Sequence, residues 1–317
     1  MKSSSGIRAV GLFLLYLGLG VCSASVWARL ADLDSLGDWH AGMISATAPA
    51  PNQYRPLVPW LAEMLRGLLP GHNLVTAYSV LRALVTGSTL YLFDRYMQSW
   101  FAPPVAAGGA LALAAILPFT YQHVVQESDP INLLAFILAF WAMARGRDLL
   151  LIPVVLFGTL NRETTAMLPA IYLIGNLGVK PFREVARRTA LLGFCWCLIY
   201  GGLRLFYGHR SYYSDVIMWK SNLISWYPSR AVFLLFGMMW VLSLFGARSG
   251  PVLLRRTLLL LPFYVALHYV IALVNEVRLF LPWAPVVIPL AWFALYPTDA
   301  RLQPGDSSRP RPGAAGY

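Results

Sequence analysis

Charged residues are scarce in this sequence. Asp, Glu, Lys and Arg together make up 12% of its 317 residues, whereas they make up about a quarter of a soluble globular domain. Hydrophobic residues make up 58%, and the mean hydropathy is +0.58. This balance excludes an ordinary soluble domain and predicts an all-α, polytopic membrane protein.

Cysteine and acidic residues are also few. Cys22, Cys195 and Cys197 all lie in apolar runs, so they offer neither a disulfide framework nor an exposed CxxC pair. The 14 acidic residues face 25 Lys and Arg, which gives a net charge of +11. These basic residues lie between apolar runs and form no continuous patch, so no nucleic-acid partner is predicted. The scarcity of lysine beside abundant Arg and Ala is typical of a GC-rich bacterial genome.

Long apolar runs, in contrast, fill most of the chain. A helix needs about 20 residues to cross the hydrocarbon core of a membrane. Eight spans are expected, over residues 7–27, 74–93, 104–120, 131–144, 189–207, 231–245, 257–274 and 279–296. Residues 1–297 therefore read as a single transmembrane domain. Residues 298–317, rich in Pro, Gly, Ser and Arg, read as a disordered cytoplasmic tail.

One apolar stretch is interrupted by an amide, a cation and an anion. Asn161, Arg162 and Glu163 separate residues 149–160 from residues 164–177, and each of these runs is too short to span a membrane. Basic residues flank both runs, and basic loops stay cytoplasmic. We therefore expect a short helical hairpin. A charge at its tip costs at least ~2.5 kcal/mol inside a membrane, so the tip must face protein, water or a ligand.

The same charge rule orients the whole chain. If the spans alternate, most Lys and Arg residues fall on the side of the two termini, which is then cytoplasmic. We expect the functional face on the periplasmic or extracellular side of a bacterial cytoplasmic membrane. Residues 28–73 form the first outer loop. Apolar residues at helical spacing after Pro56 predict a helix that lies in the membrane interface.

Unusual polar residues gather on the expected outer side. They are Asp32, Asp34 and Asp38 in the first loop; Tyr54 and Arg55; His123 and Glu127; Asn161, Arg162 and Glu163; and Asn275, Glu276 and Arg278. The planar fork of Arg suits phosphate or carboxylate, so the arginines indicate a site for a lipid phosphate or diphosphate. The alternative is that the arginines pair with carboxylates only to neutralise buried charge, Arg162 with Glu163 or Glu276 and Arg278 with another carboxylate.

The first-loop aspartates allow two interpretations. If residues 33–40 are helical, Asp34 and Asp38 share a face and form a pair that suits proton abstraction or a divalent cation. Otherwise they belong to a solvated loop. The sequence leaves open a need for Mg²⁺ or Mn²⁺. Because His40, His72 and His123 lack the spacing of metal ligands, no histidine metal site is predicted.

Three segments together resemble a known superfamily. They are GDWHAGMISATAPAPNQYRPLVPWLAE (37–63), TLNRETTAMLPAIYL (159–173) and NEVRLFLPWAPVVIPLA (275–291). The chain, over about residues 7–296, is similar to compact bacterial members of the GT-C glycosyltransferases. The resemblance implies a transferase that moves a sugar from a polyprenyl-phosphate donor to a glycan or lipid acceptor at the outer face, with inversion.

The resemblance also implies roles for individual residues. Asp38, with Asp34 second, would be the general base; Arg55, Arg162 and Arg278 would hold the lipid phosphate; Glu163 and Glu276 would orient the arginines or contact the acceptor. The chain lacks the large outer domain of better-known members, which favours a small or lipid-linked acceptor.

Two other functions fit part of the pattern. Broken helices with polar tips also build transporter sites, so a transporter or flippase for a lipid-linked sugar or another anion is the alternative. The absence of a detectable repeat and the one-sided placement of the acids speak against it. A non-catalytic subunit of a glycan-assembly complex is the third interpretation.

Overall fold

The described part of the chain is helical throughout. The structure, a computed structural model, describes residues 2–121, 128–212, 217–224 and 226–296, and these contain no β-strand. The longer helices are α1 (Lys2–Leu30), α2 (Asp34–Ile44), α3 (Leu57–Leu68), α4 (Leu74–Met97), α5 (Pro103–Ile116), α6 (Ser128–Ala144), α7 (Leu151–Asn161), α8 (Met167–Asn176), α9 (Phe182–Tyr207), α11 (Tyr227–Phe236), α12 (Met239–Gly246), α14 (Leu261–Ile271) and α15 (Ala284–Leu295). Short helices connect them: α10 (Trp219–Leu223), α13 (Val252–Leu258) and the 3₁₀ helices η1 (Asn52–Tyr54), η5 (Glu163–Ala166) and η6 (Val277–Trp283). The expected tail lies outside the described residues.

Length and composition make this a helical membrane protein. Five segments of the described chain are long and apolar enough to cross a membrane: Val10–Leu30, Pro103–Thr120, Phe182–Tyr207, Val252–Ile271 and Val277–Leu295. The expected span over residues 231–245 is instead part of a pair, α11 and α12, that bends by 59°. The bend falls at Gly237, whose φ of 52° suits glycine. The remaining two expected spans correspond to α4 and the shorter α6, so the total of eight stays a prediction.

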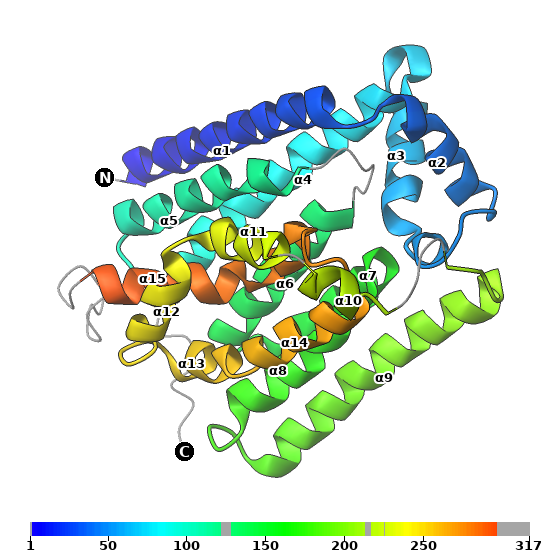
Figure 1. The fold of residues 1–317 in the computed structure, drawn as a ribbon. Coiled ribbons are helices and arrows are strands. Elements are labelled where there is room, and N and C mark those ends of the chain that lie inside the picture. The colour runs from blue at the N-terminus through cyan, green and yellow to red at the C-terminus, as the bar shows by residue number, and fades with distance from the viewer. Residues whose placement is uncertain (1, 122–127, 213–216, 225, 297–317) are drawn as a thin grey trace.

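The most deeply buried of the candidate spans ends with α15, which reaches from one edge of the molecule toward its centre (Figure 1). Every residue from Val277 to Phe293 is buried. A helix that is apolar on all sides has no face for solvent or lipid, and α15 accordingly packs against α12, α5 and α6. Its position fixes the preceding η6, which carries Arg278.

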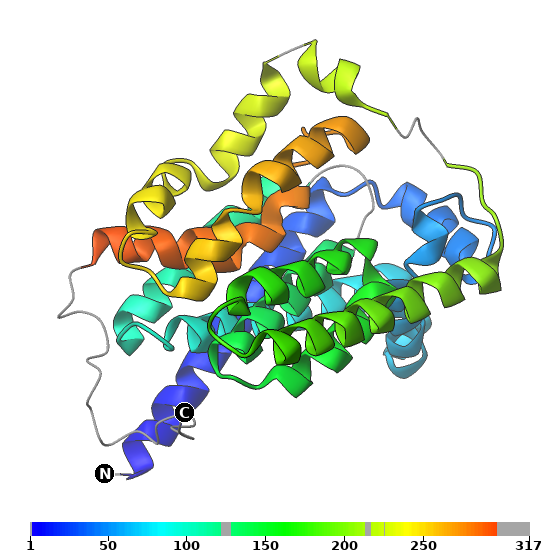
Figure 2. The same cartoon turned by 90° about the horizontal axis from the view of Figure 1, so that it is seen from below.

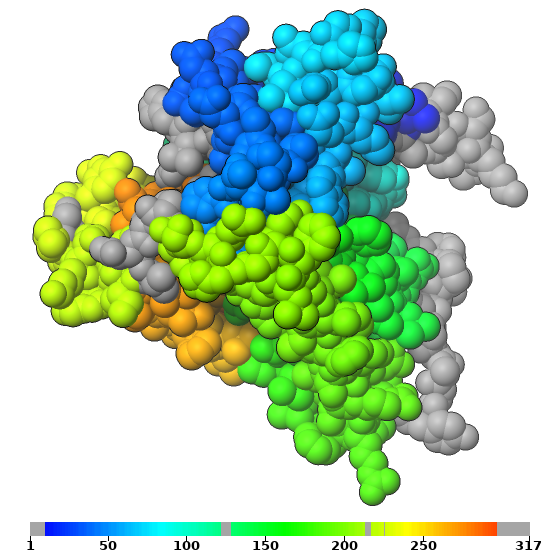
Figure 3. All heavy atoms as spheres, turned by 90° about the vertical axis from the view of Figure 1, so that its right-hand side faces the viewer, coloured from blue at the N-terminus to red at the C-terminus, as the bar shows by residue number. Residues whose placement is uncertain are grey.

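Residues 28–73, predicted to form the first outer loop, fold as a helical cap. Helix α3 occupies the residues where an interfacial helix is predicted, with Val58 and Ala62 buried and Trp60, Met64 and Leu68 exposed. Figure 3 shows this cap, from α2 to α3, seated against the end of α9. The contact is apolar and includes Tyr54 and Tyr207. The cap thereby brings residues of η1 next to α9.

Candidate functional site

The predicted hairpin is closed at the end opposite its polar tip. Asp148 precedes α7, and its carboxylate accepts hydrogen bonds from the Tyr172 hydroxyl at 2.7 Å and from Lys180 Nζ at 2.5 Å. Both donors belong to α8 or to the loop after it, so the beginning of α7 and the end of α8 meet. At the other end of the hairpin, near the polar tip, Gly158 lets α7 lie close to the residues after the turn, because a Cβ on Gly158 would lie 2.7 Å from Thr165 Cγ2.

The tip of this hairpin is anchored to the start of α6. The side-chain amide of Asn161 donates to the Ser128 carbonyl at 2.8 Å, and the Thr164 hydroxyl donates to Asn132 at 3.2 Å. Arg162 donates to the carboxylate of Asp129. These bonds place the tip beside the N-terminus of α6, where the helix dipole also favours the Asp129 carboxylate.

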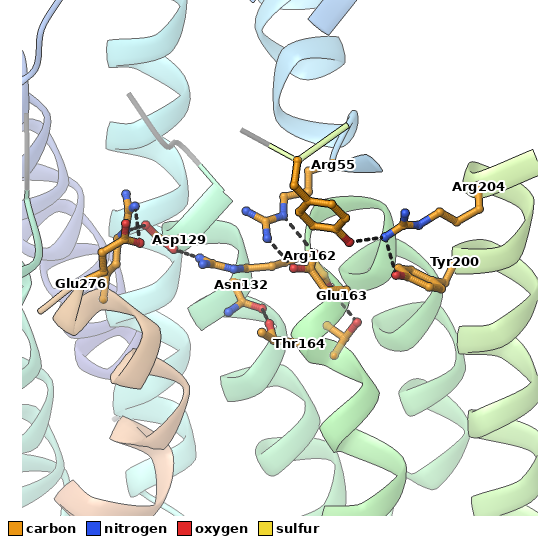
Figure 4. Close-up of polar contacts among 12 residues, drawn as sticks. Arg55, Asp129, Asn132, Arg162, Glu163, Thr164, Tyr200, Arg204 and Glu276 are labelled. Carbon is orange, nitrogen blue, oxygen red and sulfur yellow. Dashed lines mark hydrogen bonds and ion pairs between the residues drawn. The ribbon is translucent and has the colours of Figure 1, made fainter. Parts of the chain in front are cut away.

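Three sequence-distant segments meet at this tip. Arg55, which follows η1, binds Glu163 through two nitrogens, with Nε 2.9 Å from Oε2. Arg278 of η6 lies 3.5 Å from Asp129 and donates to Glu276 at 2.8 Å. Figure 4 shows the resulting chain of ion pairs. Arg162 and Arg278 are each 3% exposed, so their charges require these carboxylates.

The pairing partly matches the alternative predicted from the sequence. Arg278 does pair with a carboxylate. Arg162, however, pairs with Asp129 rather than with Glu163 or Glu276. Asp129, the acid that joins the two buried arginines, was therefore not singled out by the sequence, in which it lies two residues after Glu127 in the same predicted loop.

Glu163 is held in its charged form. Burial raises the pKa of its carboxyl, but the charge and hydrogen bonds of Arg55, with the charge of Arg162, prevail and lower it to about 2. A carboxylate with so low a pKa is a weak base. Glu163 is therefore suited to positioning Arg55 rather than to accepting a proton.

A cavity of about 460 Å³ opens beside these ion pairs. Its polar wall includes Arg55, Arg162, Glu163 and Glu276. Leu267, Ile271, Ala272 and Leu273, at the end of α14 and just after it, form an apolar wall. The cavity thus lies between two segments of membrane-spanning length, α9 on one side and Val252–Ile271, which ends with α14, on the other. Figure 2 shows α9 and α14 from below.

Helix α9 contributes a fourth arginine that the sequence did not link to the site. From the sequence, Arg204 is expected only to extend toward the membrane surface. In the structure it lines the cavity, with its guanidinium carbon 3.8 Å from the centre of the Tyr54 ring. Its Nη2 donates to the hydroxyls of Tyr200 at 2.7 Å and Tyr212 at 3.0 Å. The i, i+4 spacing of Tyr200 and Arg204 on one helix was the available signal.

The candidate site residues divide into four sets. Tyr54, Arg55, Arg162, Glu163 and Glu276 line the cavity, whereas Asn161 and Arg278 are buried beside it. Asp34 and Asp38 do share helix α2, but both are exposed and neither lines the cavity. His123 and Glu127 lie outside the described residues.

Helix α2 is instead anchored through a histidine. His40 is buried, with Nδ1 2.9 Å from the Tyr78 hydroxyl and Nε2 2.7 Å from Glu63. It thereby ties α2 to α3 and α4. Among the described residues, no group of three or more His, Cys, Asp and Glu side chains could hold a metal ion.

Comparisons with protein-family models, curated proteins and solved structures found no match. The resemblance to GT-C glycosyltransferases therefore rests on the three quoted segments.

Proposed function

We propose that this protein is a membrane glycosyltransferase that moves a sugar from a polyprenyl-phosphate donor to an acceptor at the outer face of a bacterial cytoplasmic membrane. One observation carries the proposal. The YRPL (54–57), NRET (161–164) and NEVR (275–278) segments, which are far apart in the chain, contribute Arg55, Glu163 and Glu276 to the same cavity. Segments selected for the resemblance by sequence alone thus share one site.

The size and the lining of the cavity suit such a donor. Its volume lies within the ~300–1,000 Å³ of small-molecule sites. The apolar wall near the end of α14 suits a prenyl chain, and the arginine-rich wall suits a phosphate.

The reaction is an inverting displacement. A carboxylate takes the proton of the acceptor hydroxyl, the hydroxyl oxygen bonds to the anomeric carbon, and the bond from that carbon to the phosphate oxygen breaks. Polyprenyl phosphate leaves with the electron pair. Base catalysis of this kind contributes ~10²- to 10⁴-fold, and positive charge beside the leaving phosphate adds electrostatic stabilisation.

Glu276 is the carboxylate best placed to act as the base. It lines the cavity, its side chain is 23% exposed, and only one of its oxygens is paired with Arg278. Glu163, the other cavity carboxylate among the described residues, is held by Arg55 through both oxygens. Asp38, the base that the resemblance implies, is exposed on α2 and does not line the cavity.

A transfer assay tests the function. Purified protein in lipid is offered a panel of radiolabelled polyprenyl-phosphate sugars, and both release and transfer of the sugar are measured. We expect the native chain to consume at least one donor. Binding or flipping of donors without consumption would instead favour the transporter alternative.

The same assay assigns the base. Glu276→Gln should lower turnover by about 10²- to 10⁴-fold, because the amide cannot accept the proton, while Asp38→Asn should remain active. Asp34→Asn, one turn away on α2, is the control for changes on that helix. Loss of activity in Asp38→Asn with an active Glu276→Gln would move the base to α2.

A further inference from the structure

The wall that α14 contributes to the cavity carries a histidine with an unused nitrogen. Four residues of α14 line the cavity: Tyr264, Leu267, His268 and Ile271. Their spacing places them on one face of the helix. The Tyr264 hydroxyl is already used, because it donates to the Leu279 carbonyl at 2.6 Å. His268 is 7% exposed, and its one hydrogen bond to the described residues joins Nδ1 to the Tyr264 carbonyl oxygen at 2.9 Å.

This hydrogen bond decides which nitrogen of His268 stays available. A carbonyl oxygen can only accept, so Nδ1 carries the proton, and in an uncharged ring Nε2 is then a hydrogen-bond acceptor. The ring is held in place, because its centre lies 3.9 Å from that of Tyr264 and 5.9 Å from that of Phe280. A largely buried acceptor without a partner costs free energy. A ligand that donates a hydrogen bond to Nε2 therefore gains affinity.

Only one part of the proposed donor can supply this hydrogen bond. The phosphodiester of a polyprenyl-phosphate sugar carries no proton near neutral pH, and its prenyl chain has no polar hydrogen. The hydrogen-bond donors of the molecule all belong to its sugar. We infer that Nε2 of His268 accepts a hydrogen bond from a hydroxyl group of this sugar, so His268 orients the sugar toward α14 and contributes to sugar specificity. This inference rests on the proposed function, because it names the residue with which the same cavity recognises the sugar.

Probes with and without a sugar test the inference on the native protein. Calorimetry in lauryldimethylamine oxide, a detergent without sugar, compares methyl farnesyl phosphate with the farnesyl phosphate esters of glucose, galactose, mannose and arabinose. All carry the same phosphodiester, and at pH 8 an ordinary histidine ring is uncharged. We expect at least one sugar ester to bind about three- to tenfold more tightly than the methyl ester, as for one hydrogen bond between uncharged groups. Equal affinity of all probes, or no binding of any, overturns the inference.

Variants assign this preference to Nε2. His268→Phe keeps a ring but has no acceptor, so the sugar ester should lose its advantage while the affinity of the methyl ester hardly changes. His268→Gln places an amide oxygen near the position of Nε2 and should keep part of the advantage. His209→Phe is the matched control, because His209 is exposed just after α9 and does not line the cavity; it should leave both affinities unchanged.

Three results with these variants overturn the inference. The first is a preference for the sugar ester that survives His268→Phe. The second is an equal loss of affinity for both probes in His268→Phe, which indicates a structural role. The third is a preference that His268→Gln loses as completely as His268→Phe does.

The binding measurements need no acceptor, so they separate the inference from the function. If a sugar ester is preferred through His268 but no sugar is released or transferred from any donor, the glycosyltransferase proposal fails and the sugar contact of His268 stands. If transfer occurs and His268→Phe keeps the native preference, only the inference fails. A rise in the KM for the acceptor, with unchanged donor affinities, would assign the hydroxyl to the acceptor and likewise overturn the inference alone.

Discussion

Asp129 is the residue on which the buried part of the site depends. It accepts a hydrogen bond from Arg162 and lies within ion-pair distance of Arg278, and both arginines are almost completely buried. A buried arginine without a carboxylate is strongly destabilising. Asp129 therefore stabilises two charges from two segments, and through them it holds the hairpin tip and η6 against α6.

The ion pair of Glu163 predicts how the stability of the fold depends on pH. Its folded pKa of about 2 lies below the ordinary value of 4.5, so its ion pair stabilises the fold above pH 4.5 and loses this effect as the pH falls toward 2. Glu163→Gln should lower the melting temperature in detergent by the same amount at pH 6 and pH 8, and by less at pH 3.5.

The control for this prediction is Glu184→Gln. Glu184 is as exposed as Glu163, at 34%, but pairs with Arg188 within one helix, a kind of pair worth only ~0.3–0.5 kcal/mol. Its effect at pH 6 and 8 should be the smaller one. A melting-temperature difference for Glu163→Gln that grows between pH 6 and pH 8 would contradict the assignment of charge at this residue.

At the scale of elements, the close packing of α1 on α4 supports the α2–α3 cap beside the site. Helices α1 and α4 approach at two glycines: a Cβ on Gly20 would lie 2.3 Å from the Ala83 carbonyl oxygen, and one on Gly87 would lie 3.0 Å from the Leu17 Cα. Small residues allow such backbone contact in membrane helices. The pair supports the base of the α2–α3 cap, since α2 follows α1 and α3 precedes α4.

Gly20→Ala should therefore destabilise the protein, by about 1–3 kcal/mol, the usual cost of overpacking. Gly18→Ala is the matched control on the same helix, because nothing lies within 4 Å of a Cβ there; alanine should be neutral or stabilise by up to ~1 kcal/mol. Thermal unfolding in detergent measures both. Equal effects of the two substitutions would argue against the close contact of α1 and α4.

At the scale of the whole molecule, the site and a second group of charged residues lie at opposite ends of the helices. Asp129 stands at the start of α6 and Arg145 just after its end. Asp148, with Lys180 and Arg188, likewise lies at the opposite end of the α7–α8 hairpin from Arg162. The site thus occupies one end of the helices, and several basic residues lie at the other. If the loops that carry these basic residues are cytoplasmic, the site lies at the outer face, as the proposed function requires.

Cysteine labelling tests that orientation. In a chain freed of its three native cysteines, Ser211→Cys follows α9 near the site and Ser249→Cys lies between α12 and α13; both positions are exposed. A membrane-impermeant maleimide applied to intact cells should label the first variant, and should label the second only after permeabilisation. The reverse pattern would place the cavity on the cytoplasmic side.

The sequence by itself determined the class of the protein and much of its local structure. Hydropathy fixed the helical membrane class, and the spacing of apolar residues predicted helix α3. Short apolar runs between basic flanks predicted the hairpin around Arg162, whose ends the structure brings together at Asp148. Hydropathy, the periodicity of apolar residues and the order of charges are all set by residues close together in the chain. Features that depend on them can therefore be predicted from the sequence.

Only the tertiary structure decided which charges meet. From the sequence, several acids could have paired with Arg162. The packing of the hairpin tip on α6 brought Asp129 next to it. The packing of α2 on α3 left Asp38 exposed, and the position of α9 placed Arg204 in the cavity. An ion pair depends on which helix ends lie within a few ångströms of one another, and in this chain the contributing segments are far apart in sequence.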